Sequence, residues 1–380
     1  MSYDIFQPVH EDFRKTVREF IENELAPHAD EWEEAEEFPR EVFKRMGDLG
    51  FLGMSYPEEY GGDDDRLAEA VLTEELPRCG SAGVASGIGA HIGIAMPQIN
   101  RFGTPEQKEK YLIPGIKGET IGALGVTEPE AGSDVAGIKT YAVRDGSDWI
   151  VNGSKTFITN GVRCDWVVAL VKTDREKGYR GISHIIIDRG LPGFETSKKI
   201  KKLGWKASDT GELSFIDVRV PADALLGEEG NGFFQTMANF IWEGLIMALG
   251  AVSGAEIVFQ VALQYAKDRQ AFGKPIGKFQ AISHMLADMA TEIELGRALT
   301  YHVLKLYIEG KEPMKEVAMA KLFTQSMAVR VADRAIQIHG GYGYTEEYPI
   351  ARAWRDMRLG PIGGGTDEIM KEIIARSYGL

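Results

Sequence analysis

The stretch Gly232–Gly254, GFFQTMANFIWEGLIMALGAVSG, predicts a long apolar helix with one charged residue, Glu243, in its middle. The nearest flanking charges are Glu229 and Glu256. A lone carboxylate in such a helix is costly to ionise, so burial should raise its pKa toward the range in which a general base works near neutral pH. The residues alone leave a second interpretation equally open, in which Glu243 faces solvent or pairs with an arginine of another helix.

The length and charge of the chain limit the possible classes of function. At 380 residues the chain is long for one core, and two or three subdomains are expected. The net charge of −14 argues against a nucleic-acid surface, which needs clustered lysines and arginines. The one basic run, residues 198–202, is short, and a solvated strand end explains it as well as an anion site does.

The cysteines, histidines and first residues exclude further classes. Cys79 and Cys164 lie far apart and outside any CxxC motif, so we expect no disulfide framework and no zinc site, and a reducing compartment fits. The seven histidines lack ligand spacing, so no metal site is expected. The first residues contain neither an apolar signal core nor an Arg/Ser-rich presequence, and we expect a cytoplasmic protein. The window 233–254 is long enough to span a membrane, but three polar residues argue against a span: Gln235, Asn239 and Glu243.

The hydrophobic periodicity changes twice along the chain and predicts three domains. Residues 1–117 show helical spacing. Residues 118–230 contain short β-type runs separated by turn signals such as Asp145-Gly146 and Asn152-Gly153. Residues 231–380 return to long helices. The expected fold class is therefore mainly α with a central antiparallel β-domain.

Four segments carry side chains that suit a ligand. The segments Leu124–Asp134, LGVTEPEAGSD, and Phe157–Gly161, FITNG, place glycines, hydroxyls and an aromatic ring at strand ends. Exposed backbone N–H groups and hydroxyls there suit a flat heteroaromatic ring or a phosphate. The segments Arg269–Pro275, RQAFGKP, and Gln337–Tyr344, QIHGGYGY, follow in the C-terminal region. Taken alone, the first two are also explained by a turn and a buried strand.

In this order, the four segments resemble the acyl-CoA dehydrogenase flavoprotein family over essentially the full length of the chain. The ending GGTDEIMKEIIAR is most similar to the long-chain and citronellyl-type branches. The resemblance implies a helical N-terminal domain, a β-barrel-like middle domain and a C-terminal four-helix bundle. It also implies a homotetramer in which FAD spans two subunits.

The resemblance assigns contacts to FAD by motif position. Phe157 and Thr159 should cover the isoalloxazine ring, with the Thr159 hydroxyl near N5. Arg269 should clamp a phosphate, because a guanidinium offers a rigid bidentate fork. Thr366 and Glu368 should lie by the adenosine end. The other residues expected to line the flavin, or to hold its dinucleotide portion from the neighbouring subunit, are Leu124, Val126, Thr127, Ser133, Phe272, Gln280, Gln337 and Gly341.

The position of the catalytic base departs from the family's usual pattern. The usual base is a glutamate just before a Gly-Thr pair near the C-terminus, and that position is Gly364 here. The long-chain and isovaleryl branches carry their base on the helix after the β-domain, which falls on Glu243. The resemblance therefore implies that Glu243 removes the α-proton of an acyl-CoA while a hydride leaves the β-carbon for flavin N5. The backbone N–H of Gly364 should bind the thioester oxygen.

Several residues should contact the acyl-CoA, and one of them is unusual. Family members usually have an arginine after the helical base, where this chain has Gly244, so its loss puts CoA contacts, activity or base positioning in doubt. The small residues Ala85, Ser86 and Gly89 suggest a deep or wide pocket for long or branched acyl chains. Helix packing explains these small residues equally well. The other positions assigned to the substrate are Ser133, Phe240 and Ile241.

The expected function is FAD-dependent α,β-dehydrogenation of a long- or branched-chain acyl-CoA to the trans-2-enoyl-CoA, with electrons passed to an electron-transfer flavoprotein. Two alternatives stay open. One is an oxygen-using flavoprotein on the same fold. The other is a non-catalytic acyl-CoA- or flavin-binding scaffold, for which Gly364 and Gly244 are the support.

Overall fold

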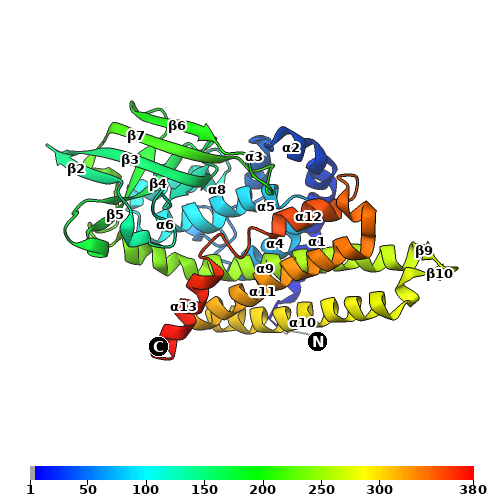
Figure 1. The fold of residues 1–380 in the computed structure, drawn as a ribbon. Coiled ribbons are helices and arrows are strands. Elements are labelled where there is room, and N and C mark those ends of the chain that lie inside the picture. The colour runs from blue at the N-terminus through cyan, green and yellow to red at the C-terminus, as the bar shows by residue number, and fades with distance from the viewer. Residues whose placement is uncertain (1–4) are drawn as a thin grey trace.

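The computed structural model describes residues 5–380, and its three regions pack around one long helix (Figure 1). The N-terminal region is helical, and its element ends follow local rules. Helix α1 begins at Pro8, a residue that suits the first turn because it lacks an N–H group. Helix α4 begins after Asp65, whose carboxylate accepts from the backbone N–H of Leu67 at 2.9 Å. The helices are α1 Pro8–Phe20, α2 Ala29–Ala35, α3 Glu41–Asp48, α4 Arg66–Glu75, α5 Ala82–Gly89, α6 Met96–Phe102, α7 Pro105–Gln107 and α8 Ile113–Ile116.

The middle region is a sheet in the order β6-β7-β3-β2-β4-β5-β8, with β1 paired to β4. Most neighbouring strands are antiparallel, as expected, but β1 and β2 each pair with β4 in parallel. The expectation of a purely antiparallel domain is wrong at these two pairs. The β2–β3 hairpin lies between β1 and β4 in the chain, and this longer connection lets β1 and β4 run in the same direction. The strands are β1 Gly122–Gly125, β2 Tyr141–Asp145, β3 Asp148–Thr159, β4 Trp166–Lys172, β5 Ile182–Asp188, β6 Phe194–Lys199, β7 Thr210–Val220 and β8 Leu225–Leu226.

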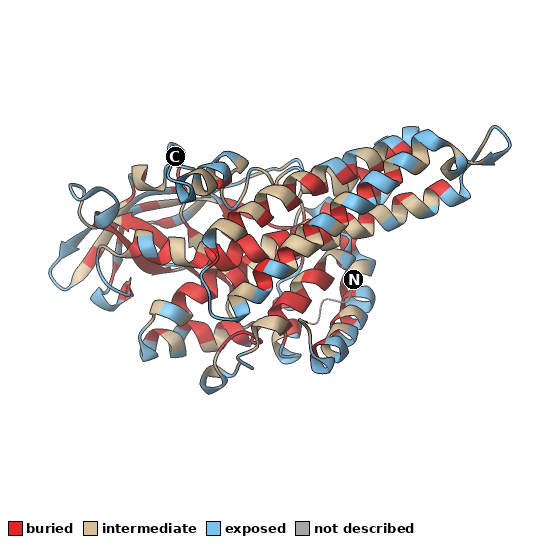
Figure 2. Cartoon of the chain, turned by 90° about the horizontal axis from the view of Figure 1, so that it is seen from below, coloured by how far each residue is buried: buried red, intermediate tan, exposed pale blue. Residues whose placement is uncertain are grey.

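The C-terminal region is helical, as expected, with three long helices and two short ones. The last two helices are short because a glycine-rich turn, Pro349 and the glycines 363–365 interrupt the chain after α11. A small hairpin, β9 Gln270–Ala271 and β10 Lys274–Pro275, projects from the far end of the bundle (Figures 1 and 2). The helices are α9 Gly232–Asp268, α10 Gln280–Ile308, α11 Met314–His339, α12 Pro349–Met357 and α13 Asp367–Ser377.

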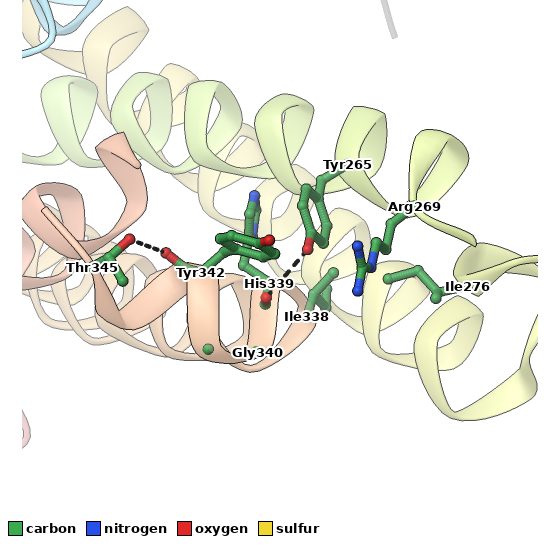
Figure 3. A pocket seen from close by; sticks show the side chains of 9 residues that line it. Tyr265, Arg269, Ile276, Ile338, His339, Gly340, Tyr342 and Thr345 are labelled. Atoms are coloured by element: carbon green, nitrogen blue, oxygen red, sulfur yellow. Dashed lines mark hydrogen bonds between the residues drawn. The ribbon is translucent and has the colours of Figure 1, made fainter. Parts of the chain in front are cut away.

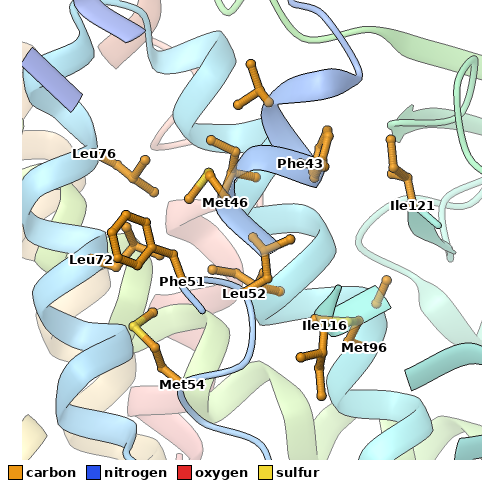
Figure 4. Packing of buried hydrophobic residues seen from close by; sticks show 14 of the residues in the cluster. Phe43, Met46, Phe51, Leu52, Met54, Leu72, Leu76, Met96, Ile116 and Ile121 are labelled. Carbon is orange, nitrogen blue, oxygen red and sulfur yellow. The ribbon is translucent and has the colours of Figure 1, made fainter. Parts of the chain in front are cut away.

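The N-terminal helices pack against one face of the sheet. Figure 4 shows part of this core, in which Leu72 lies beside Phe51 and Phe43 lies near Met46. Trp166 and Val168 of β4 belong to this core, whereas Val167 and Ala169 point into the core of the sheet domain itself. Because successive side chains of a strand face opposite ways, β4 is buried on both faces. This explains its uninterrupted apolar sequence.

Helix α9 is the element on which the other regions meet. It packs against α10 and α11 on one side and against α4 on the other. By length and composition alone it could cross a membrane. Its buried positions instead face protein helices, and they include the polar residues Gln235, Asn239 and Glu243. Figure 2 shows that the long helices of the C-terminal region carry buried, intermediate and exposed residues along their length.

Candidate active site

Glu243 lies in the buried part of α9. Its relative exposure is 8%, and its Oε2 atom has no hydrogen-bond partner within residues 5–380. Burial raises the pKa of this carboxyl from 4.5 to about 7, and the positive charge of Lys321 opposes that shift. The alternative of a solvent-facing or arginine-paired glutamate therefore does not describe this residue. A buried, partly unsatisfied carboxylate with a pKa near neutrality has the properties of a general base.

The loop that contains Gly364 lies next to Glu243. A Cβ atom built on Gly364 would lie 3.2 Å from Glu243 Oε1 and 2.5 Å from Met247 Sδ. Gly364 also has a φ of +58°, a left-handed conformation that glycine adopts without strain. Its N–H group donates to no acceptor in the described part of the chain. The structure thus brings together a free backbone donor and a carboxylate, and the Met247 sulfur and Glu243 Oε1 together leave little room for a side chain at position 364.

The small residues of α5 divide into two groups. A Cβ at Gly83 would lie 2.8 Å from the backbone nitrogen of Ala207, and one at Gly87 would lie 2.6 Å from the ring of Phe38. These two glycines therefore permit close packing. A Cβ at Gly89, in contrast, would meet nothing within 4 Å. Half-buried Ala85 packs at the edge of the N-terminal core, and half-buried Ser86 donates from Oγ to the carbonyl of Gly83 at 3.4 Å.

The structure gives Gly244 a packing role. A Cβ at this position would lie 2.7 Å from Cγ1 of Val317 in α11. Gly244 thus lets α9 and α11 approach closely, and the space for an arginine is taken by α11. Ile241 is likewise buried in the cluster that joins α9 to α10 and α11, while Phe240 is half-buried. The geometry therefore gives Gly244 and Ile241 helix contacts.

The loop after β1 is held by a buried ion pair. Lys155 of β3 is fully buried and donates from Nζ to Glu128 Oε1 at 2.8 Å and to the carbonyl of Val126 at 3.1 Å. The backbone N–H of Thr156 donates to the carbonyl of Thr127 at 2.9 Å. This pair fixes Val126 and Thr127, both half-buried, beside Leu124 at the end of β1. Ser133, further along the same loop, is exposed.

The end of β3 presents an aromatic ring to the outside. Phe157 is 65% exposed and has a φ of +59°, a strained value for a non-glycine residue. The register against β7 shifts between Lys155 and Ile158, and this bulge turns the ring outward. Thr159, two residues on, is half-buried. A large exposed apolar ring held in a strained conformation indicates a surface that a ligand covers.

A second group of predicted site residues lies around a pocket at the far end of α9 (Figure 3). A pocket of about 510 Å³ contains Arg269, Gly341 and Tyr342, with the Arg269 guanidinium 5.8 Å from the centre of the Tyr342 ring. Phe272, in the hairpin beside it, is 95% exposed, and Gln280 and Gln337 are also exposed. Figure 3 shows Arg269 and Tyr265 descending from α9 toward the segment 338–345. Arg269 and Gly341 are thus brought together as expected.

The site around Glu243 and the pocket around Arg269 are far apart within one chain. Arg269 follows Glu243 by 26 residues, which at about 1.5 Å per helical residue is roughly 39 Å along α9. A single dinucleotide does not bridge that distance. Thr366, which caps α13 by accepting from the N–H of Ile369 at 3.3 Å, and the exposed Glu368 lie near Gly364 in the chain.

Two buried lysines are absent from the residues that the sequence predicted for the site. Lys155 holds the loop after β1, and Lys321 of α11 holds the loop of Gly364. The sequence could have indicated both lysines. Each is a lone cation whose spacing places it on an apolar face, just as Glu243 is a lone carboxylate in an apolar helix.

Comparisons with known proteins agree with this architecture. Profiles for the N-terminal, middle and C-terminal domains of acyl-CoA dehydrogenases match residues 7–119, 123–218 and 230–379. The mitochondrial long-chain specific acyl-CoA dehydrogenase of Mus musculus is 44% identical over 98% of this chain and 87% of its own length. A short-chain specific acyl-CoA dehydrogenase of Clostridium acetobutylicum is 43% identical over 95% of this chain and 96% of its own.

A solved structure supports the same assignment. The crystal structure of an acyl-CoA dehydrogenase from Geobacillus kaustophilus superposes with a TM-score of 0.97 at 46% identity, and the match covers 100% of both chains. The relatives differ in the chain length that their names give, so they do not distinguish substrates by length. The chain therefore belongs to the acyl-CoA dehydrogenase family and is an oxidoreductase that acts on CH–CH groups.

Proposed function

We propose that this protein uses FAD to convert a long- or branched-chain acyl-CoA into its trans-2-enoyl-CoA, with Glu243 as the base. The observation that carries the proposal is the meeting of Glu243 Oε1 with the position of a Gly364 side chain, 3.2 Å from its Cβ. A base on the loop and a base on α9 would compete for one space. The chain carries no side chain at the first position, and the Glu243 carboxylate of α9 lies against that position together with the Met247 sulfur.

Two groups of the site have different roles in removing the proton. Glu243, whose pKa burial raises to about 7, accepts the α-proton of the acyl group. The unpartnered N–H of Gly364 donates to the thioester carbonyl oxygen and stabilises the negative charge that develops there as the proton leaves. Since both groups are held by packed elements, little reorganisation is needed during the reaction.

The residues at the sheet and at the far end of α9 fit a flavin dinucleotide. The exposed ring of Phe157, with Thr159 beside it, offers a flat apolar cover for an isoalloxazine. The loop of Leu124, Val126, Thr127 and Ser133 offers backbone and hydroxyl groups next to it. These residues would hold FAD, which would supply the acceptor for the hydride from the β-carbon. Arg269 offers a bidentate donor for a phosphate of a dinucleotide.

The separation of these two groups supports an oligomer, which we propose to be a homotetramer. The roughly 39 Å along α9 places Arg269, Gly341, Phe272, Gln280 and Gln337 too far from Glu243 to hold the same FAD within one chain. The 95% exposed ring of Phe272 at the tip of the hairpin is the kind of surface that a second copy would cover. Light scattering of the purified protein tests this, and a monomer that retains FAD would contradict it.

Open space at Gly89 supports a large acyl group. A Cβ there would meet nothing within 4 Å, whereas Gly83 and Gly87 are packed, so the opening is confined to one part of α5. Anaerobic mixing with saturated acyl-CoAs of increasing length and with branched ones tests the proposal by loss of flavin absorbance. We expect the fastest bleaching with a long or branched chain, and no bleaching with any acyl-CoA would refute the proposal. We further propose an electron-transfer flavoprotein as the acceptor, so reoxidation by that protein should outpace reoxidation by air.

A further inference from the structure

A buried lysine lies beside the proposed base. Lys321 stands on α11, and its side chain is fully buried. An ammonium group is rarely buried without compensating partners, because removing a charge from water is costly. The hydrogen-bond acceptors and charged groups around Lys321 therefore indicate its role.

Both hydrogen-bond acceptors of Lys321 belong to one loop. Its Nζ donates to the carbonyl oxygen of Gly365 and, at 3.4 Å, to that of Gly360. These two carbonyls flank Gly364, whose N–H we assign to the thioester oxygen. Gly364 and Gly365 both have left-handed backbone, with φ of +58° and +85°. Lys321 therefore holds the loop through a carbonyl on each side of Gly364.

The next turn of α11 fixes the loop to α9. Gln325 donates from Nε2 to the carbonyl of Met247 at 2.8 Å, and its Oε1 fills the space that a Cβ of Gly360 would need. Met247 lies one helical turn after Glu243, and its sulfur contacts the Gly364 position. Lys321 and Gln325 share one face of α11. This face therefore sets the distance between the base and the loop.

The charge of Lys321 also acts on Glu243. It favours the ionised carboxylate and opposes the burial that raises the pKa of Glu243 to about 7. Burial lowers the pKa of Lys321 to about 8, and the negative charges of Asp367 and Glu243 oppose that change. Glu243 Oε2 nevertheless keeps no hydrogen-bond partner among the described residues. The carboxylate is therefore influenced by a cation that does not occupy the oxygen needed for a proton.

We propose that Lys321 is a positioning residue for the proposed dehydrogenation. It holds the Gly360–Gly365 loop so that the Gly364 N–H and the Glu243 carboxylate face one acyl thioester, and its positive charge favours the ionised carboxylate of Glu243. The inference rests on the proposed function and adds to it a residue that does not touch the substrate.

Three variants test this role: Lys321→Met, Lys321→Gln and, as a matched control on the same helix, Lys315→Met, whose side chain is 37% exposed. FAD content and thermal midpoint are checked first. The rate of anaerobic flavin bleaching is then measured against acyl-CoA concentration and against pH. Amide hydrogen exchange of peptides covering residues 358–367 is measured without acyl-CoA.

In Lys321→Met we expect the limiting bleaching rate to fall about 10- to 100-fold, the scale on which misplaced catalytic groups act. The half-saturating acyl-CoA concentration should change little. The pH midpoint of the rate should move up by about one unit, because a nearby cation is lost, and amide exchange in 358–367 should become faster. Lys321→Gln keeps a donor for Gly365 but no charge, so its limiting rate should partly recover while the midpoint stays raised.

The role is overturned if Lys321→Met matches Lys315→Met in limiting rate and pH midpoint. If Lys321→Met does not fold, Lys321→Gln decides, and an unmoved midpoint in that variant overturns the role. Bleaching by the wild type together with unimpaired Lys321 variants removes only this inference. Absence of bleaching in the wild type removes the proposed function and this inference with it.

Discussion

The burial of Glu243 predicts a pH dependence that a surface glutamate would not produce. Burial raises its pKa from 4.5 to about 7. The base accepts a proton only when it is ionised, and a group with a pKa of about 7 is about 9% ionised at pH 6 and about 91% at pH 8. The bleaching rate should therefore rise about tenfold between these pH values. With an ordinary pKa, Glu243 would be about 97% ionised at pH 6, and the rate would be nearly flat.

The assay is anaerobic rapid mixing at acyl-CoA concentrations far below saturation, where the rate reports the ionisation of the free enzyme. Acyl-CoA binding is measured separately at each pH, so that a change in affinity is not mistaken for ionisation of the base. Glu256→Gln, on the same helix but with a half-exposed side chain, should keep the wild-type profile. A rate that changes less than about twofold from pH 6 to pH 8 would refute the reasoning, since it would mean that Glu243 is either fully ionised or not the base.

Three further predictions concern packing, a buried charge and the cofactor. Gly244→Ala should lower the thermal midpoint, because overpacking against α11 costs about 1–3 kcal/mol. The control Gly250→Ala, on the same helix, should raise the midpoint slightly, because its Cβ would meet only one atom, at 4.0 Å. Equal effects of the two variants would contradict this account of Gly244. Lys155→Met should destabilise the protein by about 3–5 kcal/mol, because Glu128 stays buried without its lysine partner. Adding Glu128→Gln should restore part of the lost stability, as measured by chemical denaturation. A Lys155→Met protein as stable as the wild type would argue against a stabilising ion pair. Arg269→Lys keeps the charge but not the bidentate fork, so the purified protein should retain less FAD by absorbance, and unchanged retention would show that Arg269 does not hold a phosphate.

The features predicted correctly from the sequence are those whose cause is local. The apolar run around Glu243 and the turn signals of the middle region are properties of neighbouring residues, so the helical and β-rich regions follow from them. The parallel pairing of β1 with β4 is different, because it depends on the path of a chain that first forms the β2–β3 hairpin. Periodicity carries no information on that path.

The meaning of individual small residues required the structure. Gly83, Gly87 and Gly89 look alike in the sequence, yet two of them are packed and one borders open space. Gly244 looked like a lost substrate contact because Val317, the residue that needs its space, is on another helix. A glycine records that a side chain is missing, but only the neighbouring element shows whether a ligand or a helix takes the space.

The central claim is that Glu243 is the base, and replacing it by glutamine tests that claim most directly. Glu243→Gln keeps the size of the side chain and removes its ability to accept a proton, with Glu256→Gln as the control on the same helix. In single-turnover anaerobic mixing with the best acyl-CoA, Glu243→Gln should bind FAD and acyl-CoA normally and bleach about 10²–10⁴ times more slowly than the wild type. A Glu243→Gln protein that bleaches within twofold of the wild-type rate would contradict the account.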